Sequence, residues 1–418
     1  MRARRSEAAA NLAPTAHVEL DPEAELGRDD HSFLRHRPSA RRVGRGTIRL
    51  VDLFAGCGGL TLGVEEAVRA SGRSPRIVLA AELDATIRDV YKANFPDARV
   101  DPDGDVVQLL DGRIGARITA AERKARAGAG RVDFAVGGPP CQGHSNLNNH
   151  TRRADERNAL YLRMVRAAEV LEPKSFCIEN VPGVLGDSGR VVDIAIARLE
   201  KLGYQVDAGV IDLSGLGVPQ VRFRHVLLAS TSATPSVRVL AETHRRSPRS
   251  LRWAIGDLLY VGRKTWFDTA ATLSARNLFR AQWLVKNERY DLPNRFRPPC
   301  HRDKPDHRYK SMYGRLHWGQ PAQTVTTGFG SPGQGRYLHP AFPRTLTPHE
   351  AARVQFFPDW FDFGRAGTRS ALAQCIGNAV PPKLGFAVAR HLIALADGIE
   401  LPVQPEISSS DWGAGAAE

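Results

Sequence analysis

The chain has 418 residues, of which 42% are hydrophobic and 25% charged, the balance of a soluble globular protein, and it has no run of about eighteen apolar residues that would span a membrane. Its net charge of +13 and pI of about 9.9 favour a polyanionic partner. The five scattered cysteines argue against a disulfide framework, and Cys300, His301 and His307 offer too few ligands for us to expect a metal site. No apolar segment follows the basic N-terminus, as it would in a secretory signal, so we expect a cytoplasmic protein.

Residues 1–46 are rich in Arg, Ala, Glu and Asp without apolar periodicity, and we expect a disordered tail there. From residue 47 onward, strand patterns alternate with helix patterns. This alternation predicts an α/β fold over residues 47–230, with a mostly parallel sheet and helices on both faces. The expected strands are 47–54, 76–82, 132–136, 175–178, 206–211 and 225–229, and the expected helices are 60–70, 84–94, 161–171 and 191–202.

The regular pattern stops after residue 230. Residues 231–310 hold seventeen Lys and Arg against seven Asp and Glu, so most of the excess positive charge of the chain lies in this one stretch. We therefore expect a smaller, irregular domain at residues 231–313 that faces nucleic acid. A return to the first domain follows at 314–400, with a strand-like segment at 323–326 and helices at 347–355 and 383–395, before a flexible tail at 401–418.

The first strand ends in Asp52 and Phe54 and runs through a glycine-rich turn into a helix, which is typical of a nucleotide-type cofactor site. Glycines let the backbone approach a ligand, and the helix start offers N–H groups to an anion. Glu82, at the end of the second strand, can accept hydrogen bonds from ribose hydroxyls, and Asp105 can contact an adenine. The alternative is that Gly56, Gly58 and Gly59 only form a tight turn.

Cys141 follows two prolines at the C-terminal end of a predicted strand, the edge at which open α/β sheets form their sites. A thiolate is a soft, strong nucleophile that also leaves readily, which suits attack on C6 of a pyrimidine. The alternative is a buried structural cysteine, an interpretation that suits Cys57, Cys177 and Cys375 better because of their apolar or tightly turning surroundings.

Glu179 ends the next strand, so its carboxyl group is expected at the same edge as Cys141, where it can bind N3 and the exocyclic amine of a cytosine. Arg222 and Arg224 lie on one side of the chain because they alternate, and they can hold the cytosine O2 and orient the site. Taken singly, an exposed acid and two solvated arginines remain the alternatives.

Five motifs occur in one order: 52–59 (DLFAGCGG), 139–142 (PPCQ), 179–181 (ENV), 220–224 (QVRFR) and 377–382 (GNAVPP). This set resembles the DNA cytosine-C5 methyltransferase family over residues 47–395. The resemblance implies a Rossmann-like sheet that binds S-adenosylmethionine, and a target-recognition domain at 231–313. It also implies methylation at C5 of a cytosine flipped out of double-stranded DNA.

The resemblance also implies site residues. Cys141 is the nucleophile, Glu179 the partner of N3, Arg224 the contact to O2 and Arg222 its support. Leu83 stands where some relatives have an aromatic residue, so weaker stacking on the cofactor is expected. The residues implied for cofactor binding are Asp52, Phe54, Ala55, Gly56, Gly58, Gly59, Glu82, Leu83, Asp105, Val106, Pro139, Asn378, Ala379 and Val380.

Three further expectations concern partners and alternatives. We expect a monomer that acts in a prokaryotic DNA-modification or restriction-modification system, in which a restriction endonuclease can be its companion. One alternative is an RNA cytosine-C5 methyltransferase, against which the large recognition insert argues. The other is a DNA-binding protein with a decayed catalytic site, against which the intact Cys141, Glu179 and Arg224 argue.

Overall fold

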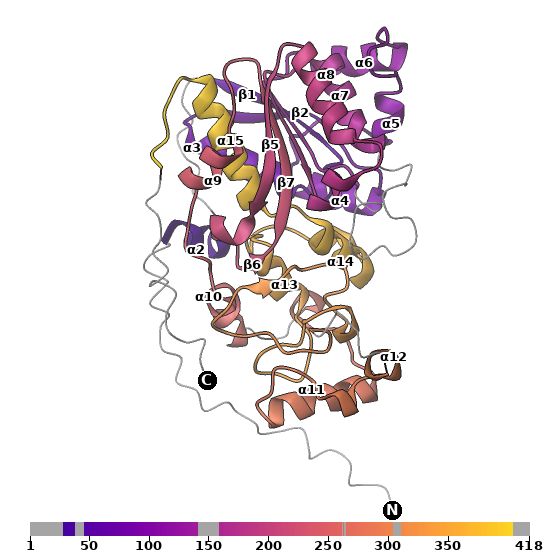
Figure 1. The fold of residues 1–418 in the computed structure, drawn as a ribbon, viewed down its shortest axis with the longest axis vertical. Coiled ribbons are helices and arrows are strands. Elements are labelled where there is room, and N and C mark those ends of the chain that lie inside the picture. The colour runs from indigo at the N-terminus through magenta and orange to yellow at the C-terminus, as the bar shows by residue number, and fades with distance from the viewer. Residues whose placement is uncertain are drawn as a thin grey trace, which may run out of the picture.

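The structure is a computed structural model, and it describes residues 28–37, 46–140, 159–260, 262, 265–303 and 311–403. Its centre is a six-stranded sheet in the order β2-β1-β3-β4-β7-β5 (Figure 1). Strand β7 runs antiparallel to both of its neighbours, whereas β2, β1, β3 and β4 are mutually parallel. The mostly parallel α/β sheet predicted from the sequence is confirmed. The strands are β1 (Thr47–Leu53), β2 (Ser74–Ala81), β3 (Phe134–Gly137), β4 (Ser175–Asn180), β5 (Gln205–Asp212) and β7 (Phe223–Ser230).

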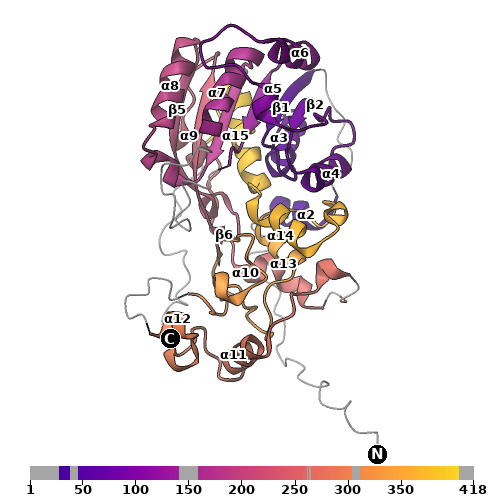
Figure 2. The same cartoon turned by 90° about the vertical axis from the view of Figure 1, so that its right-hand side faces the viewer.

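Helices cover both faces of this sheet because successive strand residues point to opposite sides. In β1, Leu50 belongs to one apolar cluster and Val51 to the other. The first cluster packs under α3 (Gly59–Ala70), α9 (Val237–Thr243) and α15 (Pro382–Ala396), and the second under α6 (Ala120–Ala129), α7 (Ala159–Leu171) and α8 (Val191–Lys201), as Figures 1 and 2 show.

Helices α3 and α15, far apart in the sequence, cross in close contact. The two helix backbones approach so closely that only glycine fits at the crossing. A Cβ atom on Gly63 would lie 2.0 Å from the carbonyl oxygen of Pro382, and one on Gly385 would lie 2.5 Å from that of Leu60. The expected helix at 383–395 is confirmed by α15, which packs against α3.

The expectation of a disordered tail up to residue 46 is wrong for residues 28–37. They contain helix α2 (Arg28–Arg35), whose Leu34 is completely buried and whose Phe33 stacks on Phe356 at a ring distance of 5.9 Å. Arg35 forms an ion pair with Asp257 at 2.9 Å. Phe33 and Leu34 are two adjacent apolar residues in a polar segment, and such a pair shows no helical periodicity. The sequence therefore contains no sign that this segment packs as a helix on the core.

The expected start of the separate basic domain is residue 231, but the segment that directly follows this residue packs on the large core. Helices α9 and α10 (Leu251–Ile255) belong to the large core, and Trp253 of α10 is buried in it. A separate apolar cluster of Ala281, Leu284, Leu292 and Leu338 lies below, around α11 (Ala275–Lys286) and near α12 (Pro299–Arg302). We call residues 270–303 and 311–315 the small lobe; Figures 1 and 2 show α11 and α12 at the end of the molecule away from the sheet.

Side-chain caps fix many helix starts. Asp84 caps α4 (Ala85–Asn94). Thr119 and Thr347 form capping boxes with Glu122 and Glu350 at the starts of α6 and α13 (Pro348–Val354). No helix of the described ranges is long and apolar enough to cross a bilayer. Further elements are α5 (Val106–Leu109), α14 (Arg369–Asn378), the paired strands β6 (Gln220–Val221) and β8 (Ala322–Gln323), and the 3-10 turns η2 (Pro182–Gly186), η3 (Leu213–Leu216), η4 (Gly256–Tyr260), η5 (Trp266–Asp268), η6 (Asn294–Phe296), η7 (Pro332–Gln334) and η8 (Gly364–Ala366).

Candidate active site

A cavity of about 360 Å³ lies at the carboxyl ends of β1, β2, β3 and β4. It brings together residues from all five sequence motifs. A larger hollow of about 540 Å³ between α2, α3 and α15 holds none of the predicted site residues. The predicted residues that line the smaller cavity are Phe54, Ala55, Gly56, Gly59, Glu82, Leu83, Asp105, Val106, Pro139, Glu179, Arg224, Asn378, Ala379 and Val380.

The glycine-rich turn after β1 forms one wall. Phe54 adopts a left-handed backbone conformation with a φ of 58°, and the N–H of Gly56 donates to a Glu82 carboxylate oxygen at 2.8 Å. A Cβ on Gly58 would lie 2.3 Å from the ring of Phe95, and one on Gly59 would lie 2.2 Å from the carbonyl oxygen of Val380. Gly58 and Gly59 therefore serve the packing of the turn, and only Gly56 opens onto free space.

Glu82 and Asp105 present carboxylates to the cavity in fixed orientations. The second oxygen of Glu82 accepts from the N–H of Asp84 at 2.9 Å, and burial raises the pKa of Glu82. Asp105 caps the short helix α5 by accepting from the N–H of Val107 at 2.8 Å. Leu83 is 68% exposed at the cavity mouth. The chemistry of this wall is that of two acceptor groups flanked by apolar side chains.

Asp52 and Gly58 are the two predicted cofactor residues that do not line the cavity. Asp52 points away from it, toward α3, where its carboxylate accepts from the Thr61 hydroxyl at 2.5 Å. Burial raises the pKa of Asp52 to about 7. The Thr61 hydroxyl also lies 2.9 Å from the Tyr91 hydroxyl. The aspartate therefore supports the turn from behind, in contrast to the direct ligand contact expected from the sequence.

Glu179 and Arg224 face each other inside the cavity wall. The guanidinium Nε of Arg224 lies 2.7 Å from a Glu179 oxygen, and both side chains are nearly buried. Burial raises the pKa of the Glu179 carboxyl, and the charges of Arg224 and Arg222 oppose that rise. A Cβ on Gly138 would lie 3.1 Å from the other Glu179 oxygen, so the acid sits directly against the segment that carries the two prolines.

Arg222 points into the protein and does not line the cavity. It donates to the carbonyl oxygens of Val325 at 2.9 Å and Ala379 at 3.0 Å. Gln355, which sequence reasoning missed, donates to the Ala379 carbonyl at 3.4 Å and accepts from Gln220 at 2.6 Å. This glutamine cluster (Gln220, Arg222 and Gln355) joins the strand of Arg224 to the cavity wall at Ala379. In the sequence, the only sign of a role for Gln355 is its position as a polar residue at the end of the expected helix 347–355.

Cys141 lies outside the residues that the structure describes, as does His307. The chain is described up to Pro140, and both Pro139 and Pro140 line the cavity. Asn180, a second residue that sequence reasoning did not assign, donates to the Pro139 carbonyl at 3.3 Å and thereby ties the end of β4 to this turn. Within the described ranges, no three His, Cys, Asp or Glu side chains gather in a way that could hold a metal ion.

Comparison with known proteins fits this geometry. The model of the family described as C-5 cytosine-specific DNA methylase matches residues 48–394. The chain belongs to that family. This methylase is 44% identical over 365 residues to the Type II methyltransferase M1.BsuMI of Bacillus subtilis, covering 87% of this chain and 84% of the relative. It is 30% identical to the Type II methylase M.HgiDII of Herpetosiphon aurantiacus, over 84% of this chain and 96% of the relative.

Solved structures confirm the fold of the methylase. The crystal structure of a putative DNA modification methyltransferase encoded within an Escherichia coli prophage aligns over 84% of this chain and 99% of its own, with a TM-score of 0.57 and 23% identity. That of the Entamoeba histolytica methyltransferase EhMeth aligns with a TM-score of 0.54 and 16% identity, over 84% of this chain and 98% of its own. Membership in the family makes the chain a DNA (cytosine-5-)-methyltransferase.

Proposed function

We propose that this methylase transfers a methyl group from S-adenosylmethionine to C5 of a cytosine flipped out of double-stranded DNA, within a specific sequence. The observation that carries the proposal is the Glu179–Arg224 pair, which lies 2.7 Å apart in the wall of the same cavity that Phe54 and Glu82 line. The pair stands beside the two prolines that directly precede Cys141. An acid, a cation and a nucleoside-type cradle thus share one cavity, whose lining includes the two prolines that precede the proposed nucleophile in the sequence.

The residues of the cavity fit S-adenosylmethionine. Both oxygens of Glu82 are held by backbone N–H groups and each keeps a lone pair that can accept from a ribose hydroxyl. Phe54, Val106 and Val380 supply apolar surface for an adenine, and Asp105 an acceptor for its amino group. The open space at Gly56 suits the amino acid end. When bound here, S-adenosylmethionine supplies an electrophilic methyl group.

The chemistry of the protein groups follows from their environment. The Cys141 thiolate adds to C6 of the target base. Burial favours the protonated form of the Glu179 carboxyl by raising its pKa, and the charges of Arg224 and Arg222 oppose this effect; we propose that Glu179 binds N3 and helps to protonate it as the thiolate adds. Arg224, held by its pairing with Glu179, is oriented to bind the cytosine O2. The addition makes C5 nucleophilic, so that C5 would form the new bond to the methyl group; loss of the C5 proton and departure of the Cys141 sulfur then restore the aromatic ring. The base must leave the helix stack because C5 and C6 are inaccessible within a duplex.

Residues 231–313, which include most of the small lobe, are proposed as the target-recognition region. Arg280, Arg297 and Arg315 of the lobe donate to backbone carbonyls and so hold it together. Lys286, Arg289 and Arg295 are exposed and are proposed to contact phosphates. The two relatives are named as a Type II methyltransferase and a Type II methylase. We propose that this chain likewise acts in a prokaryotic restriction-modification system, beside a companion endonuclease and as a monomer.

A trapping experiment tests the proposed nucleophile. A fluorine at C5 cannot leave as a proton does, so a duplex with 5-fluorocytosine at its methylation sites should leave Cys141 bound to C6. With S-adenosylmethionine present, the wild-type enzyme should form an adduct that survives denaturing electrophoresis, and Cys141→Ser should bind the duplex but form none. Cys300→Ser, at an exposed cysteine of the small lobe, is the matched control and should form the adduct. An adduct with Cys141→Ser would refute the assignment.

Bisulfite sequencing of DNA from cells that express the wild-type enzyme would then reveal its target sequence. Labelled methyl transfer to duplex DNA and to tRNA, compared side by side, separates the proposal from the RNA alternative. Transfer to tRNA alone would overturn the assignment to DNA.

A further inference from the structure

Arg88 connects two segments that no backbone hydrogen bond joins at the rim of the cavity. It lies on α4 and is partly buried. Its Nη1 nitrogen donates to the carbonyl oxygens of Glu82 at 2.7 Å, Leu83 at 3.2 Å and Asp103 at 3.1 Å. The first two oxygens belong to the turn after β2 and the third to the turn before α5. Both turns line the cavity, through Glu82 and Leu83 on one side and Gly104 and Asp105 on the other.

Regular backbone pairing between these segments stops just before the rim. Ala80 pairs with the neighbouring segment through the Arg99 carbonyl at 2.9 Å and the Asp101 N–H at 2.8 Å. Beyond this point the chains separate into the two turns. The Arg88 guanidinium connects the two turns where backbone hydrogen bonds no longer do, because one of its nitrogens donates to carbonyl oxygens of both turns.

The two turns approach each other closely where Arg88 binds them. Gly104 has a φ of 70°, and a Cβ there would lie 1.8 Å from the Glu82 carbonyl oxygen and 2.8 Å from Arg88 Nη1. Three carbonyl oxygens that converge on one point repel each other and need a donor. The guanidinium of Arg88 supplies that donor.

We propose that Arg88 is a positioning residue for the cofactor, one that fixes the distance between the Glu82 turn and the Asp105 turn. The inference rests on the proposed function, in which Glu82 receives the ribose and Asp105 the adenine of S-adenosylmethionine. Arg88 is absent from the cavity lining and acts through the two backbone turns. Its loss widens the adenosine end of the cavity and leaves the Glu179–Arg224 pair in place.

The fold does not depend on this arginine. Helix α4 starts at its own cap, where the Asp84 side chain accepts from the N–H groups of Thr86 at 2.9 Å and Ile87 at 3.1 Å. The buried residues Val90 and Tyr91 anchor the same helix in the core. A variant at Arg88 is therefore expected to fold, with a change confined to the two turns.

The test uses S-adenosylhomocysteine binding to the full chain, measured by calorimetry, and duplex DNA binding without cofactor. Arg88→Met should weaken S-adenosylhomocysteine binding roughly tenfold, since the donor to the two turns is lost, and should leave the DNA affinity unchanged. The S-adenosylhomocysteine affinity of Arg88→Lys should lie between those of the wild type and Arg88→Met, because the lysine ammonium still carries three donors. Lys92→Met, one turn along α4 and 48% exposed, is the matched control and should bind as the wild type does.

Hydrogen exchange gives a readout that general destabilisation would not reproduce. In Arg88→Met without ligand, amides of residues 101–105 should exchange faster, while those of β1 and β4 stay protected. Unchanged S-adenosylhomocysteine binding by Arg88→Met, or an equal loss in Lys92→Met, would overturn the proposal. If Arg88→Met does not fold, Arg88→Gln takes its place with the same expected results. A wild-type protein that binds no S-adenosylhomocysteine would instead overturn the cofactor assignment itself.

Discussion

Asp52 and Glu82 both close a parallel strand, yet their carboxylates end in different places. The sequence predicts both as cofactor contacts, since both stand at the edge of the sheet where ligands bind. Strand alternation sends Asp52 toward α3, where the Thr61 hydroxyl binds it, whereas Glu82 turns with the chain and accepts from Gly56. The roles of the two acids thus depend on the direction of each side chain, which cannot be read from its position in a motif.

The buried Asp52 predicts a dependence of stability on pH. Its pKa is about 7 in the folded protein, above the ordinary value near 4 of an unfolded chain. Between these values the folded state binds more protons, so this group lowers stability as the pH rises from about 4 to 7. Asp52→Asn removes the effect. The free energy of unfolding of the wild type, minus that of Asp52→Asn, should fall by up to about 4 kcal/mol between pH 4 and pH 8.

Urea denaturation of both proteins at several pH values measures this difference. Asp89→Asn, at an exposed acid of α4, controls for the removal of a carboxyl group from the surface, and the change with pH for Asp52→Asn should exceed the change for this control. A constant difference for Asp52→Asn across the same range would contradict the raised pKa.

Helix α2 shows how a short element gains stability that its sequence does not provide. Its eight residues are too few for an isolated helix in water. Contacts to the rest of the chain hold it, including the buried Leu34, the ion pair of Asp30 with Lys383 at 2.5 Å and the pair of Arg35 with Asp257. These contacts join α2 to α15 and to the turn after α10.

Replacement of Leu34 tests how far α2 belongs to the core. Leu34→Ala should lower the free energy of unfolding by roughly 2–5 kcal/mol, through lost burial and the cavity left behind. Ser32→Ala, an exposed position of the same helix, should change it by less than about 0.5 kcal/mol. Chemical denaturation monitored by tryptophan fluorescence measures both. Equal, small effects of the two substitutions would mean that the helix is dispensable for stability.

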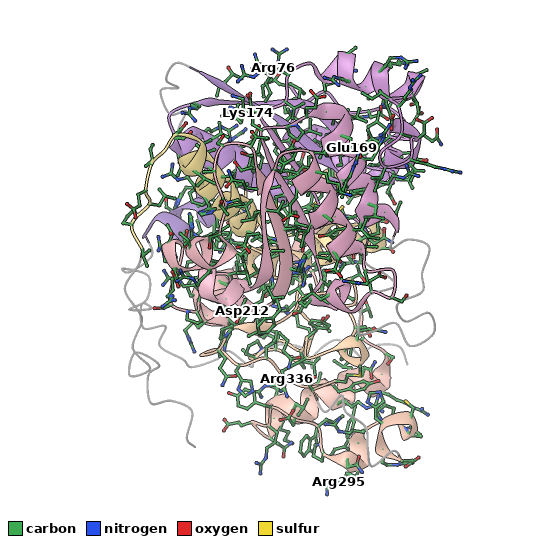
Figure 3. The ribbon with its side chains drawn as sticks, turned by 45° about the horizontal axis from the view of Figure 1, so that its top comes forward. Arg76, Glu169, Lys174, Asp212, Arg295 and Arg336 are labelled. Carbon is green, nitrogen blue, oxygen red and sulfur yellow. The ribbon has the colours of Figure 1, made fainter. Side chains whose placement is uncertain are left out.

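At the scale of the whole molecule, the sheet and the small lobe lie at opposite ends, and basic side chains are present at both. Figure 3 shows Arg76 and Lys174 at the end formed by the sheet, and Arg295 at the opposite end, in the small lobe. The ends are joined by polar networks. Within them, His349 of α13 contacts Asp268 at 2.9 Å and Asp359 at 2.8 Å, and Arg353 also binds Asp359. The glutamine cluster adds a second link, between the strand of Arg224 and Ala379.

The proposed division of charge predicts how salt affects DNA binding. Neutralising Lys286, Arg289 and Arg295 together by alanine should weaken duplex binding. It should also lower the slope of log affinity against log salt by about 1 for each phosphate contact that is lost. Replacing Arg76 and Lys174 by alanine, at the other end, should leave the slope unchanged. Fluorescence anisotropy at several salt concentrations measures it, and an equal effect of the two variants would place the DNA elsewhere.

Strand and helix patterns in the sequence are enough to predict the sheet and its alternation with helices, and the ordered motifs identify the family. These are local signals: strand and helix periods, glycine turns and ordered short motifs depend on neighbouring residues. The tertiary structure alone decided which motif residues reach the cavity. It turned Asp52 and Arg222 inward, assigned Gly58 and Gly59 to packing, brought Gln355, Asn180 and Arg88 to supporting positions and placed α2 on the core. Such choices arise from contacts between segments far apart in the chain, whose partners a linear pattern cannot specify.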